Sequence, residues 1–310
     1  MSRFDRIAKI ADAVLWEGYM LYPYRPSNVK NRQRWTFGGL YPVAYAEMKG
    51  EASKLRAEVL VRPSKRTCLT IIVRFLHLLS QEANGRTIQR AMPREVMLSG
   101  LSLGSRHTRS FSFPALDRRE GEIRTSQERI EGVIQVISAP ADSVAHTLTV
   151  TVTNTAQFSG PLHVSRDEAS MQALVATHVI LHASNGGFVS AIDPPRQFSE
   201  AASRCTNQGV WPVLAGEPGS TKWMLAPPMV LPDYPQIAEE SPGDLFDGTE
   251  IDEILTLRVL TMSDAEKEEM RRADPRLGEL LERTESLTQN EMLKLHGVLR
   301  NPRARAAGTE

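Results

Sequence analysis

The segment "HTLTVTVTNTA", residues 146–156, shows the clearest β-strand pattern in the chain. Leu148, Val150 and Val152 alternate with threonines, so an extended backbone would place apolar side chains on one face and hydroxyl groups on the other. This period of two residues is typical of a strand that is buried on one side. The segment therefore predicts that the chain contains a β-sheet with one apolar face.

Further β-type runs lie on both sides of this segment, from about residue 54 to residue 192. The runs are "LRAEVLVRP", "TCLTIIVRFLHLL", "REVMLSG", "RSFSFPAL", "RIEGVIQVISAP", "ALVATHVILHAS" and "GFVSAID". The last two flank "NGG", which is a strong hairpin signal. Short strands that follow one another without interleaved helices favour an antiparallel sandwich or barrel over a parallel α/β sheet.

Both ends of the chain have helical patterns. Apolar residues recur at helical spacing within residues 3–16, which predicts a short amphipathic helix that ends near Gly18. From residue 250 onward the pattern is again helical, and Ser263 followed by Glu266 forms a capping box. We therefore predict an α+β fold class, with an antiparallel β-sandwich-like core, an N-terminal helix and a helical C-terminal cap.

Prolines and glycines divide the chain into segments. They are frequent between the β-type runs and the C-terminal helical pattern, in "DPPRQ", "GEPGS" and "SPGDLFDGT". Long connecting segments inside compact proteins are uncommon and are often functional. The predicted organisation is an N-terminal helix over 1–18, a β-sandwich-like domain over 19–192, an ordered Pro/Gly-rich connecting segment over 193–249, a helical region over 250–300 and a frayed tail over 301–310.

The composition is that of an ordinary soluble protein. The 37 Lys and Arg residues balance the 37 Asp and Glu residues, so the net charge gives no general attraction to nucleic acid or to a membrane. Cys68 and Cys205 are too few for a disulfide framework, and neither is part of a CxxC pair. The N-terminus lacks a long apolar run, and no segment approaches the roughly 20 apolar residues of a spanning helix. We expect a cytoplasmic protein with reduced thiols.

A Tyr/Arg segment, residues 19–45, interrupts this even distribution. It holds five of the chain's six tyrosines, and no acidic residue lies between Glu17 and Glu47. Its prolines predict an extended or turn backbone. Tyrosine and arginine are enriched at protein-binding hot spots. The candidate partner-binding residues are Tyr22, Tyr24, Arg25, Lys30, Asn31, Arg34 and Trp35.

Two other interpretations of this segment remain open. The tyrosines can cover an end of the sandwich with their hydroxyl groups in water, while the arginines extend along the surface. Alternatively, cations and stacking rings can bind nucleic acid, which we consider less favoured because the chain has no basic domain.

An acidic segment, "EESPGDLFDGTEIDE", covers residues 239–253 and holds seven carboxylates. Its candidate site residues are Asp244, Asp247, Glu250, Asp252 and Glu253. The carboxylates can cap the following helix and complement its dipole, or they can dock against the cations of residues 25–34. They can also bind Mg²⁺ or Ca²⁺, although their spacing does not match an EF-hand.

A third candidate site involves His178 and His182 of "THVILH", together with Cys205. The two histidines share a face, but on a strand they lie about 13 Å apart, which is too far for one ion. Cys205 extends the set to a possible site for a soft transition metal, and a buried structural cysteine is the alternative. The sequence has no Walker A, Rossmann, HExxH or G-x-S-x-G motif. We therefore assign no catalytic residue and no cofactor.

Two long stretches resemble a protein family encoded beside bacterial nickel–iron hydrogenase structural and maturation genes. They are "EGYMLYPYRPSNVKNRQRWTFGGLYP" and "PGDLFDGTEIDEILTLRVLTMSDAEKEEMRRAD", and "NQGVWPVL" fits the same family. The resemblance covers most of the chain and implies a cytoplasmic accessory role in hydrogenase assembly, maturation or complex formation. It implies a hydrogenase subunit or maturation factor as partner, and no catalytic residue can be transferred from it.

These observations lead to one hypothesis and one alternative. The hypothesis is a non-enzymatic accessory or assembly protein that binds a protein partner. The alternative is a metal-binding protein or metal-dependent enzyme that uses the acidic segment 244–253 or the set of His178, His182 and Cys205.

Overall fold

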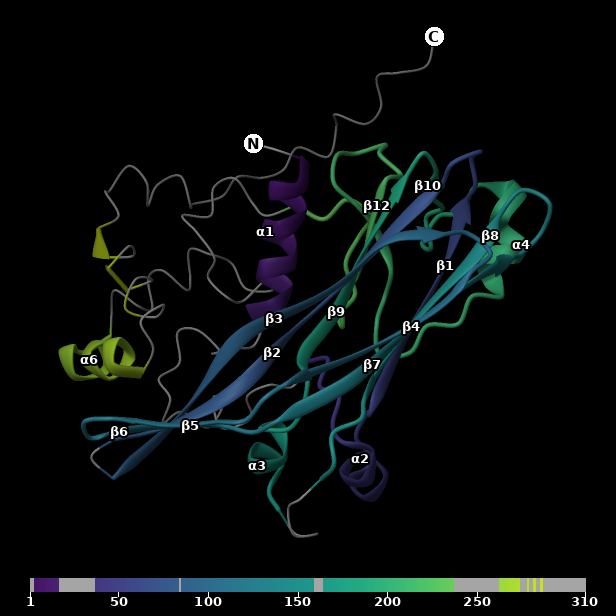
Figure 1. The fold of residues 1–310 in the computed structure, drawn as a ribbon. Helices are drawn as coiled ribbons and strands as arrows, with labels where there is room; N and C mark the ends of the chain where they lie inside the picture. Colours follow the sequence, from purple (N-terminus) through teal and green to yellow (C-terminus); the bar gives the residue numbers. More distant parts are fainter. Residues whose placement is uncertain are drawn as a thin grey trace. The chain divides into compact units, whose positions relative to one another are not determined.

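The computed structural model describes residues 3–16, 37–83, 85–158, 164–236 and 262–273, together with residues 278, 281, 282, 285 and 286. The chain divides into two compact units. The first comprises residues 1–19 and 33–236, and the second comprises residues 20–32 and 237–310. Both sheets belong to the first unit (Figure 1).

The first unit contains two antiparallel sheets. The five-stranded sheet has the order β10 (Gly187–Phe188), β1 (Lys54–Arg62), β8 (His146–Asn154), β7 (Ile130–Pro140) and β4 (Arg106–Phe113). The seven-stranded sheet has the order β11 (Val213–Ala215), β12 (Trp223–Ala226), β9 (Val175–Ser184), β2 (Cys68–Ala83), β6 (Ile123–Gln127) and β5 (Leu116–Glu120), and β3 (Arg86–Ser102) pairs with β2. The prediction of a fold dominated by antiparallel sheet is confirmed.

The main hydrophobic core is built from both sheets. On β8, Leu148, Val150 and Val152 are fully buried, as the alternating pattern of this strand predicts. They belong to the same apolar cluster as Val73 and Phe75 of β2. The two sheets therefore share one core, which fixes the alternation of side chains along every strand that lines it.

Helix α1 (Arg3–Trp16) covers the other face of the seven-stranded sheet, and the predicted N-terminal helix is present. Ile7, Ile10 and Val14 form an apolar cluster with Ile72 of β2 and Ile180 of β9. An ion pair between Asp12 and Arg74, with nitrogen and oxygen 2.6 Å apart, joins the helix to β2. The amphipathic pattern of this segment thus reflects burial against a sheet.

The remaining described helices are short. They are α2 (Val43–Lys49), α3 (Arg166–Ser170), η2 (Arg196–Phe198), α4 (Ser199–Ser203) and, in the second unit, α6 (Asp264–Ala273). The predicted non-helical backbone ends earlier than residue 45, because Pro42 occupies the N-cap position of α2. The predicted capping box of α6 is confirmed by hydrogen bonds in both directions between Ser263 and Glu266. The rest of the predicted C-terminal cap lies outside the described residues and stays a prediction.

The predicted hairpin at "NGG" is wrong. Strand β9 lies in the seven-stranded sheet, whereas β10 pairs with β1 in the five-stranded sheet. Asn185 has a φ of 49°, and a Cβ atom at Gly187 would lie 2.3 Å from the Thr221 Oγ1 atom. These residues therefore form a tight corner that carries the chain from one sheet to the other, and glycine is needed there because another segment passes very close.

The β-region is longer than the predicted domain boundary at residue 192. Strands β11 and β12 lie within the predicted connecting segment, and β12 extends the sheet by pairing Trp223 with His182 of β9. Each of these strands has only three or four residues. Runs this short between prolines and glycines have no measurable period, so the sequence could not indicate them.

Candidate functional site

Residues 106–137 form one long hairpin that changes sheets. In the base of the hairpin, Phe113 of β4 lies opposite Ile130 of β7. In its tip, Leu116 of β5 lies opposite Gln127 of β6. The two strands of the hairpin therefore keep the same register across the gap, which is two residues long on each strand. Pro114 lies in the gap, where it has no N–H to donate. The base belongs to the five-stranded sheet and the tip to the seven-stranded sheet.

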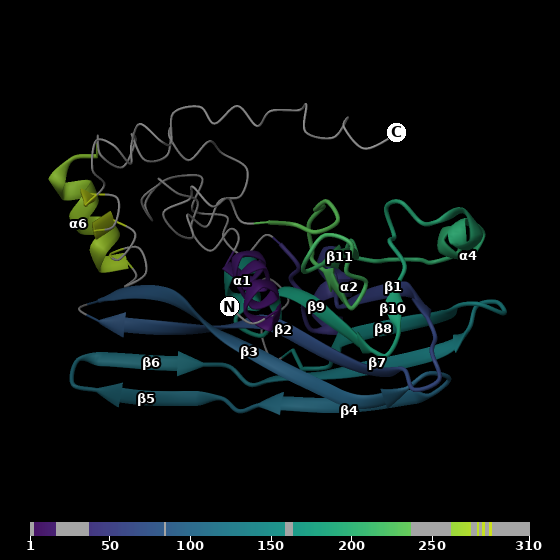
Figure 2. The ribbon, with the colours of Figure 1, turned by 90° about the horizontal axis from the view of Figure 1, so that it is seen from above.

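The tip of this hairpin joins the far half of β2. Residues 80–82 of β2 pair with β6, whereas residues 68–76 pair with β9. Strand β3 pairs with β2 along both halves. The far halves of β2 and β3 (residues 77–83 and 86–94) therefore form a four-stranded sheet with β5 and β6, which we call the arm (Figure 2).

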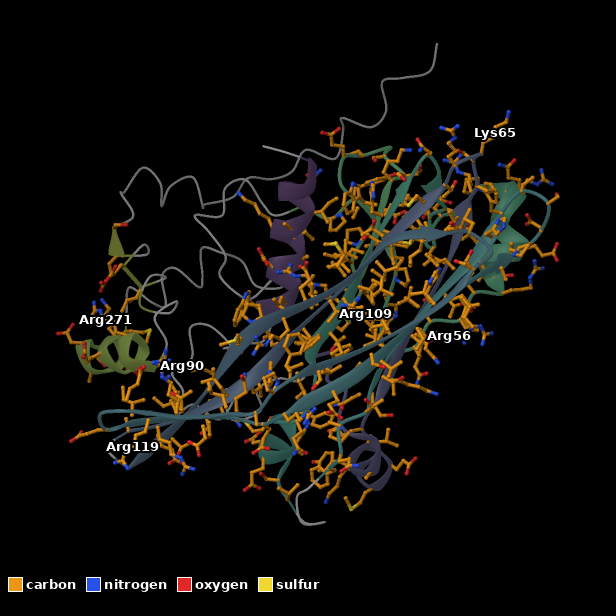
Figure 3. All side chains as sticks on the ribbon, in the orientation of Figure 1. Arg56, Lys65, Arg90, Arg109, Arg119 and Arg271 are labelled. Atoms are coloured by element: carbon orange, nitrogen blue, oxygen red, sulfur yellow. The ribbon has the colours of Figure 1, made fainter. Side chains whose placement is uncertain are left out.

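The arm has two different faces, because directly opposed residues of neighbouring strands share a face. One face continues the core-lining side of β2 beyond Phe75, and we call it the arginine face. Its members are His77, Leu79, Gln81, Ile88, Arg90, Met92, Arg94, Leu116, Arg118, Glu120, Ile123, Thr125 and Gln127. The opposite face carries Asp117, Arg119 and Arg124, and Figure 3 shows Arg90 and Arg119 on opposite sides of the arm.

The root of the arm is held by His77 and Gln127. The His77 Nε2 atom donates a hydrogen bond to the Glu128 carbonyl oxygen, 2.8 Å away. The Gln127 side chain donates to the carbonyl oxygens of His77 and Leu78. Burial lowers the pKa of His77 to about 4, so the ring is neutral at physiological pH. These hydrogen bonds fix the position at which the hairpin leaves one sheet and enters the other.

Two arginines on the arginine face have unsatisfied donors. The Arg94 guanidinium carbon lies 4.7 Å from the centre of the Phe113 ring, and Nη2 donates to Gln127 at 3.3 Å. The Nε atoms of Arg94 and Arg90 are buried, and neither has a hydrogen-bond partner among the residues that the structure describes. Burial also lowers the pKa of Arg94. A buried donor without an acceptor costs free energy, and each of these side chains as a whole is half-buried, so the rest of its guanidinium group is the part that a partner can reach.

Exposed aliphatic side chains accompany these arginines. Leu116 of β5 is 41% exposed and Ile123 of β6 is 45% exposed. The only acidic side chain on the described part of the arginine face is Glu120, which forms an ion pair with Arg118. The face therefore combines a local excess of positive charge with apolar surface, which is the composition of many protein-binding surfaces.

The sequence did not lead us to the arginine face, although a signal was present. In "TIQRAMPRE", Ile88, Arg90, Met92 and Arg94 recur at a period of two residues. This alternation predicts that two arginines and two apolar side chains share one face of a strand. What the sequence could not indicate is that the pairing of β4 with β7 in the five-stranded sheet ends at Phe113 and Ile130, where the hairpin passes into the arm.

The predicted partner-binding residues lie outside the described part of the chain, as do the predicted acidic site residues 244–253. Of the Tyr/Arg segment, the structure describes Tyr41 and Tyr45, which are buried with ring centroids 5.3 Å apart. The Arg166 guanidinium carbon lies 5.4 Å from the centre of the Tyr41 ring, and burial raises the pKa of Tyr41. These two tyrosines serve packing.

The structure does not bring the three predicted metal ligands together. His178 is fully buried on β9, and its Nδ1 atom lies 2.9 Å from the Ala176 carbonyl oxygen. The His182 ring lies against that of Trp223, with ring centroids 4.2 Å apart and the ring planes tilted by 37°. Cys205 packs in a separate apolar cluster, and burial raises the pKa of its thiol to about 11. The described residues contain no group of three or more His, Cys, Asp or Glu side chains that could hold a metal ion.

Among the described residues, one buried carboxylate with several hydrogen-bond donors, that of Glu58, has a structural role. Glu58 of β1 is buried and accepts hydrogen bonds from the Arg56 and Thr149 side chains. It also accepts from the backbone N–H and the hydroxyl group of Thr206. Burial acts to raise the pKa of Glu58, but these hydrogen bonds together lower it. Glu58 therefore holds the loop that contains Thr206 against the sheet.

Comparisons with known proteins do not add a family to this description. Neither the models of known protein families nor the curated proteins give a match to the chain. Within the described ranges, none of the helices combines the length and the apolar character that are needed to cross a membrane.

Proposed function

We propose that this chain is a non-enzymatic accessory protein that binds a protein partner through the arginine face of the arm. The observation that carries this proposal is that Arg90 and Arg94, which are half-buried, have no acidic partner among the described residues of the face, where Glu120 pairs with Arg118. Exposed Leu116 and Ile123 lie on the same face. Arginine and apolar side chains in one patch supply the specific hydrogen bonds and the buried area that a stable interface needs.

The cellular process and the identity of the partner are proposed from the sequence resemblance. It suggests hydrogenase maturation or complex formation as the process, and a hydrogenase subunit or maturation factor as the partner. The Tyr/Arg segment, with Tyr22, Arg25 and Arg34, is proposed as a second contact with the same partner.

Co-purification with defined partners tests the proposal. The tagged chain is co-expressed with the hydrogenase subunits and maturation factors of its own cell, and R90E and L116D variants are compared with R119E. Arg119 lies on the opposite face of the arm, so R119E controls for charge reversal as such. We expect partner recovery to fall at least tenfold for R90E and L116D and to be unchanged for R119E. Equal recovery with all three variants, with circular dichroism showing intact folds, would reject this surface.

A further inference from the structure

We infer that the arginine face takes an acidic segment of the partner, whose carboxylates bind Arg90 and Arg94 while its apolar side chains contact Leu116 and Ile123. This inference rests on the proposed function and adds the chemistry of the partner. It begins from the arrangement of charge. Arg118 is paired with Glu120, so the cations that remain without an acidic partner on the described face are Arg90 and Arg94.

The spacing of these two arginines indicates how the segment lies. Arg90 and Arg94 are both on the core-lining side of β3, with Met92 between them. Side chains four residues apart on a strand are separated by about 13 Å, so each guanidinium group needs its own carboxylate. An extended acidic segment that lies along β3 can supply these from residues at the same four-residue separation. A carboxylate can accept two N–H groups of one guanidinium group, which gives such contacts directional specificity.

The apolar neighbours favour a polypeptide over a nucleic acid. Leu79 of β2 lies opposite Arg90, on the side toward the aliphatic side chains of β5 and β6, and Met92 lies between the two arginines along β3. A nucleic acid would use stacking aromatic rings beside the cations. At the described arginine face the His77 ring is fully buried, and the Arg94 guanidinium group already lies over the Phe113 ring, so neither ring is free to stack on a base. An acidic segment with interspersed leucine-like side chains satisfies both the donors and the apolar surface.

Fluorescence anisotropy with labelled peptides tests this inference on the full chain. The probe is a twelve-residue peptide with the repeat Glu-Ala-Leu-Ala, which in an extended chain places Glu and Leu on one face with the Glu residues four positions apart. The comparison peptides replace Glu by Gln or by Lys. We expect the Glu peptide to bind at least tenfold more tightly than the Gln peptide and the Lys peptide not to bind. The R90Q/R94Q double variant should lose at least tenfold in affinity for the Glu peptide, whereas R119Q should retain it. Equal binding of the Glu and Gln peptides, or no effect of R90Q/R94Q, would overturn the inference.

Other occupants of the face give different results, each of which also overturns the inference. Tighter binding of single-stranded oligothymidine than of the Glu peptide would assign the face to nucleic acid. If the molecular mass measured by sedimentation is halved in the R90Q/R94Q variant, the arginine face would be assigned to a second copy of the chain. Peptide binding that appears only after the carboxylates of residues 239–253 are changed to amides would assign it to the chain's own acidic segment.

The peptide and co-purification experiments can fail separately. If R90E abolishes recovery of the hydrogenase partner while the Glu and Gln peptides bind equally, the acidic chemistry is wrong and the proposed function stands. If the Glu peptide binds through Arg90 and Arg94 but no partner is lost in R90E or L116D, the face binds acidic segments and the proposed function is wrong for this surface.

Discussion

At the scale of single residues, two buried histidines are held in their neutral form. His77 and His178 are fully buried, and each directs one ring nitrogen to a backbone carbonyl oxygen, of Glu128 and of Ala176 respectively. The other ring nitrogen of each is buried without a hydrogen-bond partner among the described residues. Burial is the main reason that the pKa of each ring falls from 6.5 to about 4. A proton on either ring would therefore oppose folding.

These pKa values predict a loss of stability in mild acid. Between pH 6.5 and about 4 the unfolded chain binds protons at these histidines and the folded chain does not. The contribution to stability is fully present above pH 6.5 and is lost as the pH falls to about 4, by roughly 3 kcal/mol for each histidine. Urea unfolding at pH 7.5, 5.5 and 4.5 measures this loss.

Variants of His77 and His178 test whether these two side chains cause the loss of stability in mild acid. H77Q and H178Q should each remove about half of the change in unfolding free energy between pH 7.5 and 4.5, whatever they cost at neutral pH. The double variant should remove most of it. An unchanged pH dependence in the double variant would show that other groups cause the acid sensitivity.

The residues that matter most at this scale could not be predicted from the sequence. Glu58 binds Thr149 and Thr206, which are 91 and 148 positions away in the chain. The alternating pattern of β3 places Arg90 and Arg94 on one face, but only the structure shows that their Nε atoms are buried without acceptors among the described residues. Hydrogen-bond satisfaction of this kind depends on which distant segments meet, and local patterns carry no information about it.

At the scale of the elements, local periodicity predicted helix α1 and strand β8 correctly, because each has a continuous apolar pattern that one neighbouring layer buries. The prediction of a hairpin at "NGG" was wrong for a physical reason. A turn signal specifies a change of direction, but the sheet that the chain enters next depends on its distant partner, here β1. The same limit applies to the hairpin of residues 106–137, whose pairing continues across two sheets.

This long hairpin has a tight contact at Gly132. A Cβ atom at Gly132 would lie 2.3 Å from Cζ of Phe111, which is opposite it on β4. The Phe111 ring stacks on Phe75 of β2 with centroids 5.7 Å apart, so it cannot move without disturbing the core between the sheets. G132A should therefore lower the free energy of unfolding by about 2 kcal/mol, the usual size of an overpacking effect. Urea unfolding measures this change.

A double-mutant cycle separates overpacking from a general effect on the strand. F111L removes the end of the ring that a Cβ atom at residue 132 would meet. We expect G132A to cost clearly less in the F111L background than in the original chain. Equal cost in both backgrounds would mean that the contact with Phe111 is not the cause.

For the whole molecule, the open edges of the sheets decide which surfaces are available to partners. Among the described residues, β3, β4 and β5 each pair on one side. Pro93 lies within β3, and it has no N–H to offer to an added strand. Arg109 lies on the core-facing side of β4, opposite the buried Ile134, and is exposed. Features of this kind protect sheet edges from pairing with another chain. A partner is therefore expected to use the arginine face.

Removing this protection should change the association of the whole molecule. In R109V a β-branched side chain replaces the charge on the core-facing side of the β4 edge, so strand pairing between two chains no longer buries a guanidinium group. We expect R109V to form dimers or larger species at concentrations where the original chain does not, as measured by size-exclusion chromatography with light scattering. R106V is the matched control, because Arg106 lies on the same strand but on its outer face. If R109V and R106V have the same mass as the original chain, Arg109 does not protect the edge, and strand addition at β4 becomes an alternative to binding at the arm.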